Sequence, residues 1–127
     1  KRTVYLPVMR SSGYDGQNAF DFPDPAMING NRKSSTIAPQ ALYLMNSPLI
    51  HKCSNALAEM HKNATSNAPT SNRINWMILH LLSRPATKKE TLRAENFIHA
   101  YSPGNEQAAW AAFARTLFAS NEFLYIE

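Results

Sequence analysis

The chain has 127 residues, of which 44% are hydrophobic and 10% aromatic, and its 13 Lys and Arg against 9 Asp and Glu leave a net charge of +4. This length and composition indicate one globular domain with a packed core and exclude a disordered chain. The basic residues form no dense stripe or motif, which argues against nucleic-acid binding, and no apolar run approaches the roughly 18 residues of a membrane-spanning helix.

The N-terminal part, residues 1–35, is rich in prolines and turn-forming residues and lacks helical periodicity. We expect an extended segment and a long loop there, beside a helical domain of residues 36–127. Large apolar side chains are costly to expose, so the loop should pack either on this domain or on a neighbour, which makes it a candidate interaction surface. Its candidate contact residues are Tyr14, Phe20, Asp21, Phe22, Asp24 and Met27.

Two prolines then predict two helices that meet at a corner. Pro39 and Pro48 each suit the first position of a helix, and Ser47 is placed to cap the second one. One face of this second helix is expected to be buried, with Cys53 on it as a small hydrophobic residue. The residues of that face are Ile50, Cys53, Leu57 and Met60.

Three further helices and a final turn follow a polar loop expected over residues 61–72. The third helix begins at Arg73 and ends at Arg84 and Pro85, and its apolar residues recur at helical spacing. Thr87 and Glu90 form a capping box for the fourth helix, whose inner face should carry Ala94, Phe97, Ile98 and Tyr101. The fifth helix is expected to be capped by Asn105 and the last turn by Ser120.

The fold class predicted from these patterns is mainly α, a single-domain bundle of about five helices. The apolar stripes of the helices meet in one core. The residues expected inside it are Ile50, Cys53, Leu57, Ile74, Met77, Ile78, Leu81, Phe97, Trp110, Phe113, Leu117 and Phe118.

Few residues point to chemistry. His51 and Cys53 are two positions apart and point in different directions on a helix, and neither an H-E-x-x-H motif nor a Cys pair occurs, so we expect no metal site. A single cysteine also cannot form the C-x-x-C-H sequence that attaches haem, so no cofactor is expected in this chain. Arg84 follows the end of a helix, where a cation meets the negative end of the helix dipole, and a structural role is favoured.

Three ordered stretches, STIAPQALYLMNSPLI, LLSRPATKKETLRAENFI and AWAAFARTLFASNEFLYIE, together with FDFPDP, resemble a known family. This is the planctomycete PSD-type C-terminal domain of cytochrome c-associated proteins, domain of unknown function 1553. One departure is Leu82-Ser83, where the family commonly has Leu-Gly. The matching residues are Ala38, Pro39, Gln40, Asn46, Ser47, Pro48, Arg84, Pro85, Glu90, Asn121, Glu122, Phe123 and Tyr125.

The resemblance implies context rather than a reaction, because no activity is established for the family and no catalytic residues can be carried over. Relatives usually carry this domain at the C-terminal end of an exported, extracytoplasmic protein with a haem-binding segment upstream, and a start at Lys1 rather than Met is in keeping with a piece of a longer chain. We therefore expect a non-catalytic packing or interaction module whose partners are upstream domains of the same polypeptide. The alternative is an enzyme active site shared with those domains, with Asp21 and Asp24 at the seam. The sequence does not indicate an oligomeric state.

Overall fold

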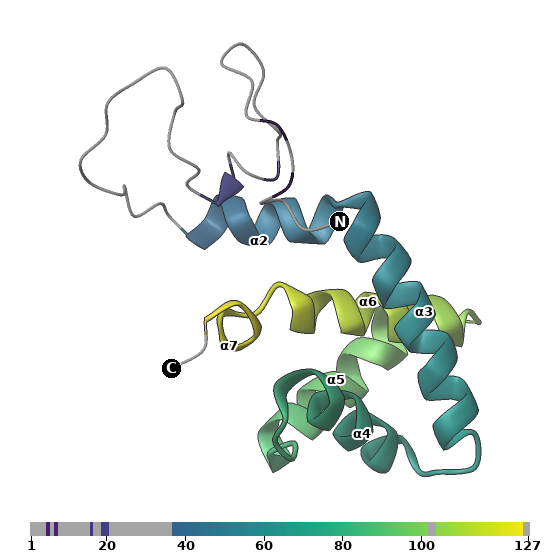
Figure 1. Cartoon of the computed structure of the whole chain (residues 1–127). Coiled ribbons are helices and arrows are strands. Elements are labelled where there is room, and N and C mark those ends of the chain that lie inside the picture. The colour runs from purple at the N-terminus through teal and green to yellow at the C-terminus, as the bar shows by residue number, and fades with distance from the viewer. Residues whose placement is uncertain are drawn as a thin grey trace. The chain divides into compact units, whose positions relative to one another are not determined.

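The computed structural model describes residues 5, 7, 16, 19, 20, 37–101 and 104–125. The chain divides into two compact units, Lys1–Tyr43 and Leu44–Glu127. Within the described residues all regular elements are helices, which confirms the mainly α class. The helices, labelled in Figure 1, are α2 (Ile37–Asn46), α3 (Pro48–Thr65), α4 (Thr70–Leu82), α5 (Lys88–Tyr101), α6 (Glu106–Phe118) and α7 (Asn121–Leu124).

In the first unit, Tyr43 of α2 is contacted by residues from the N-terminal part of the chain. The ring of Phe20 packs edge-on against Tyr43, with 6.2 Å between ring centroids. Gly16 also lies close by, because a Cβ atom at that position would stand only 2.8 Å from the Tyr43 hydroxyl oxygen. Phe20 therefore packs on a helix of its own unit.

Most of the expected N-terminal segment lies outside the described residues, so the division at residues 35 and 36 stays a prediction. The same holds for five of the six candidate contact residues of the loop. These five are Tyr14, Asp21, Phe22, Asp24 and Met27.

The start of α3 confirms one prediction made from the sequence and contradicts another. Pro48 is the first residue of the helix, as predicted, and Ser47 before it has an extended backbone with φ −65° and ψ 127°. The side chain of Ser47 makes no capping hydrogen bond, so that expectation was wrong. Proline at the first helical position carries no N–H, so the helix start has one free donor fewer.

The prediction of a polar loop over residues 61–72 is also wrong, because α3 continues to Thr65 and α4 already begins at Thr70. His61 and Thr65 are buried on the same face of α3 as Ala58. The Thr65 hydroxyl donates to the backbone oxygen of His61 at 2.6 Å. Packing of this last turn therefore outweighs its polar composition.

The core of the second unit is centred on α6, whose middle part is rich in buried alanine. Packing between α3 and α6 is the most extensive of any helix pair, and α5 also packs on α6. Ser54 and Ala58 of α3 are buried and small, which lets two helices approach closely. Five predicted core residues are confirmed as buried: Ile74, Met77, Ile78, Trp110 and Phe113. Ala94 and Ile98 of α5 are buried as well.

Several other predicted core residues lie at the margin of the core, and three are exposed. Cys53 is exposed, and Met60 and Tyr101 are 58% and 49% exposed, so their predicted burial was wrong. On α3 the reason is that the helix turns its small residues, not its larger apolar ones, toward α6. The partly buried residues packed against the core include Leu57, Leu81, Phe97, Leu117 and Phe118, while Ile50 is half-buried.

None of the helices in the described part of the chain combines the length and the apolar character needed to cross a membrane.

Candidate functional site

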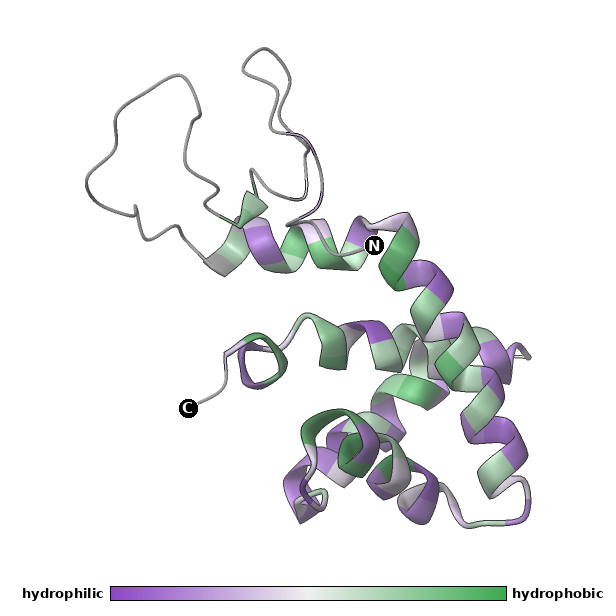
Figure 2. Cartoon of the chain, in the orientation of Figure 1, coloured by the Kyte–Doolittle hydropathy of each residue, from purple (hydrophilic) through white to green (hydrophobic). Residues whose placement is uncertain are grey.

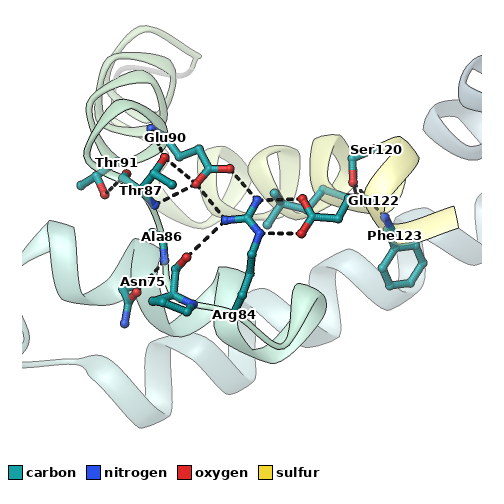
Figure 3. A network of polar contacts seen from close by, with 11 residues as sticks. Asn75, Arg84, Ala86, Thr87, Glu90, Thr91, Ser120, Glu122 and Phe123 are labelled. Carbon is teal, nitrogen blue, oxygen red and sulfur yellow. Dashed lines mark hydrogen bonds and ion pairs between the residues drawn. The ribbon is translucent and has the colours of Figure 1, made fainter. Parts of the chain in front are cut away.

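The most extensive polar network among the described residues is centred on Arg84, just after the end of α4 (Figure 3). Its Nη1 donates to Glu90 at 3.0 Å and to the backbone oxygen of Pro85 at 3.2 Å. Its Nη2 donates to Glu90 and Glu122, both at 2.7 Å, and its Nε donates to the other oxygen of Glu122. A guanidinium has five N–H donors, so all of them are used. We call Arg84, Glu90 and Glu122 the Arg84 cluster.

The backbone at Ser83 directs Arg84 into this network. Ser83 is the C-cap of α4 and adopts a left-handed conformation with φ 57° and ψ 22°. Its N–H donates to the backbone oxygen of Leu79 at 3.0 Å, which closes the last turn of the helix. The chain then leaves the helix axis, and Pro85 prevents the helix from continuing.

The predicted capping box of α5 is confirmed and forms part of the same network. The Thr87 hydroxyl and N–H donate to Glu90 Oε2 at 2.7 and 2.8 Å, and the Glu90 N–H donates to Thr87 Oγ1 at 3.3 Å. Asn75 of α4 accepts a hydrogen bond from the Ala86 N–H at 2.8 Å, which ties the connection to the preceding helix. Glu90 thus caps α5 and holds Arg84 at once.

The charges of the Arg84 cluster reinforce one another. Hydrogen bonds from Arg84, followed by that from the Thr87 N–H, lower the pKa of Glu90 to about 2. Hydrogen bonding from Arg84 also lowers the pKa of Glu122, and the two carboxylates, Glu122 first, raise the pKa of Arg84. All three groups are therefore charged at neutral pH, and the cluster carries one more negative than positive charge.

A cleft of about 820 Å³ lies next to the cluster, between the end of α4 and the C-terminal turn α7. Phe123 and Tyr125 are 38% and 50% exposed, so they do not seal the core. The Phe123 ring contacts Phe118 edge-on at 5.1 Å, but α7 is too short to cover the core. The cleft is lined by Leu81, Leu82, Ser83, Asn121, Glu122, Phe123 and Tyr125.

A second cluster, which sequence reasoning missed, surrounds His61 in the core. The His61 ring is fully buried and lies 4.1 Å from the Trp110 ring and 5.6 Å from that of Trp76, centroid to centroid. The Arg73 guanidinium lies over Trp110 at 4.6 Å. Glu106 accepts a hydrogen bond from Trp110 Nε1 at 3.0 Å and forms an ion pair with Arg73.

Burial first, and then the positive charge of Arg73, lower the pKa of His61 to about 4. The ring is therefore neutral at physiological pH. Because no part of it is exposed in this conformation, His61 cannot act as a base toward a substrate in solution. Its spacing from the buried residues Ala58 and Thr65 on α3 is the sequence signal that indicates its burial.

The structure brings together only some of the motif residues. Arg84, Glu90 and Glu122 meet although they belong to different helices or connections, with Pro85 accepting from Arg84. Gln40 and Ser47 are buried. Ala38, Pro39, Asn46 and Pro48 are exposed, and Asn121, Phe123 and Tyr125 line the cleft. Among the described residues, no three His, Cys, Asp or Glu side chains are grouped so that they could hold a metal ion.

Within the described residues, the fold and the Arg84 cluster define a helical domain in which Arg84, after the end of α4, is joined to α5 and α7. Residues 1–98 match the family PSD1, described as a protein of unknown function (DUF1553), so the chain belongs to this family. The match ends before α7, yet Glu122 of α7 is bonded to Arg84 within the matched range. Searches of curated proteins and of solved structures find no significant match.

Proposed function

We propose that this chain is a non-catalytic helical packing or interaction module at the C-terminal end of a larger, exported, planctomycete-type protein associated with cytochrome c. Its partners are upstream domains of the same polypeptide, and its location is extracytoplasmic. The association, the location and the type rest on the family resemblance of the motifs.

The observation that supports a non-catalytic role is the saturation of the Arg84 cluster. An arginine that binds a substrate needs free N–H donors, whereas all five donors of Arg84 are taken by Glu90, Glu122 and the Pro85 carbonyl. Glu90 in turn accepts from Thr87. The motif residues Arg84, Glu90 and Glu122 therefore serve to join α4, α5 and α7.

The haem of such a protein would belong to the upstream part. One cysteine is too few for covalent attachment, and Cys53 lies on an exposed face of α3 without a second cysteine in the chain. This chain would contribute packing surface to its neighbours and no cofactor ligand.

The test is association with the separately expressed upstream region, measured by isothermal titration calorimetry. Phe20 is 41% exposed in this chain, and replacing Phe20 and Phe22 by Ser should weaken that association more than it lowers the melting temperature. Leu92→Ser provides a matched control on α5, where the leucine is 61% exposed. Unchanged association with a large loss of thermal stability would show that these phenylalanines belong to the fold of this chain and not to a contact surface.

A further inference from the structure

One face of α3 carries four apolar residues that the protein core does not use. Leu49 and Met60 are 67% and 58% exposed, and Cys53 and Ala56 between them are also exposed. Figure 2 shows hydrophobic and hydrophilic residues alternating along this helix. We call Leu49, Cys53, Ala56 and Met60 the α3 stripe.

The α3 stripe is separate from the buried face of the helix. Ser54, Ala58 and His61 are buried in the core, and at 100° per residue the centre of the stripe lies roughly 140° around the axis from theirs. Leu57 fills part of the interval and is partly buried. The helix therefore has a core face and a second apolar face directed to solvent.

The spacing of the stripe is that of a helix-pairing seam. Its residues are separated by four, three and four positions, as d, a, d and a positions of a coiled coil are. The two central residues, Cys53 and Ala56, are small, so a second helix can approach closely there. The larger residues, Leu49 and Met60, stand at the two ends of the seam.

The charges beside the stripe match a second copy of the same helix in antiparallel orientation. Lys52 and Glu59 occupy equivalent flanking positions one heptad apart, and neither has an ion-pair partner among the described residues. When Leu49 of one copy lies opposite Met60 of the other, Lys52 of each copy lies beside Glu59 of its partner. In a two-fold symmetric pair, each Lys52 and each Glu59 therefore has an oppositely charged neighbour. A parallel pair would instead place Lys52 near the apolar Leu57.

We propose that the α3 stripe binds the α3 stripe of a second copy of this chain, giving an antiparallel, two-fold symmetric dimer. The contact spans about three helical turns, which is small beside a standard interface of roughly 1,600 Å². The dimer is therefore weak and depends on protein concentration. This inference does not depend on the function proposed above.

Sedimentation equilibrium of the purified chain over a range of concentrations tests the dimer. The average mass should rise from that of one chain toward that of two, and Leu49→Glu with Met60→Glu should keep the protein at the lower mass. Leu92→Glu changes a leucine of similar exposure on α5 and should associate as the wild type does. A wild type that stays monomeric throughout, or a dimer that survives the double substitution, would overturn the proposal.

Charge reversal tests the antiparallel register, with positions 52 and 59 exposed enough to leave folding intact. Lys52→Glu alone and Glu59→Lys alone each place like charges opposite one another and should weaken self-association about 4- to 30-fold. An equimolar mixture of the two variants pairs opposite charges again and should recover the wild-type mass. Single variants that associate like the wild type, or a mixture that stays monomeric, would contradict this geometry.

Discussion

Replacing Ser83 by Gly should stabilise the protein, although it removes a side chain. Ser83 has φ 57°, a left-handed conformation that strains residues with a Cβ atom but not glycine. The hydroxyl of Ser83 makes none of the hydrogen bonds found among the described residues, so little is lost with it.

The magnitude follows from two opposed contributions. Releasing the left-handed strain is worth about 1–2 kcal/mol, and the greater freedom of glycine in the unfolded chain costs about 0.4–1 kcal/mol. The central values differ by a net gain of about 0.8 kcal/mol, which corresponds to a rise in melting temperature of about 2–5 °C for a domain of this size. Thermal and urea unfolding followed by circular dichroism would measure it.

Ser66→Gly is the matched control, because Ser66 is the C-cap of α3 with φ −54° and needs no glycine. This variant should be neutral or destabilised by up to about 1 kcal/mol. Ser83→Ala, which keeps the Cβ atom, should bring no gain. If Ser83→Gly unfolds at the wild-type temperature or below it, the left-handed conformation is not a source of strain and the reasoning fails.

Three further predictions concern the core and the two clusters. Trp110→Ala should destabilise the protein by about 3–5 kcal/mol in urea unfolding, because the ring is 2% exposed; a wild-type transition would refute its core role. Arg84→Lys should lower the melting temperature, but by less than Trp110→Ala, since lysine cannot bridge Glu90 and Glu122 bidentately; an equal melting temperature would contradict a joining role. The pKa of His61 in the folded protein is about 4, below the ordinary value of 6.5. Between pH 6.5 and 4 the unfolded chain therefore binds more protons at this residue than the folded protein does. The free energy of unfolding should fall by about 3 kcal/mol as the pH drops through this range. His61→Phe should make this slope smaller and leave only the contribution of carboxylates such as Glu90, whose pKa is also lowered; a slope unchanged in this variant would refute the assignment.

The elements that the sequence alone determined are those whose cause is local. The capping box of Thr87 and Glu90, the cap at Asn105 and the cap at Ser120 each join residues three apart, and all three are formed. The apolar period that marks α4 likewise predicted the burial of Ile74 and Met77. Such signals need no knowledge of the partner helix.

Only the tertiary structure decided which face of α3 enters the core. Its sequence offers one face of larger apolar residues, which includes Cys53 and Met60, and another face of small or polar residues, and the larger apolar residues favoured burial of the first. A second helix can approach the alanine-rich part of α6 closely. The face of α3 with the small residues Ser54 and Ala58 therefore packs there, and His61 on the same face is buried with them. The spacing of apolar residues predicts that a helix has a buried face, but the shape of the neighbouring helix decides which face that is.

The Arg84 cluster shows the same division. The sequence alone places Arg84 after the end of a helix and favours a structural role, which we attributed to the helix dipole. The observed partners are Glu90, six residues away, and Glu122, 38 residues away. The packing of α7 beside α4 creates the second contact. A long-range ion pair depends on where the chain returns in space, and that position follows from the packing of the whole core.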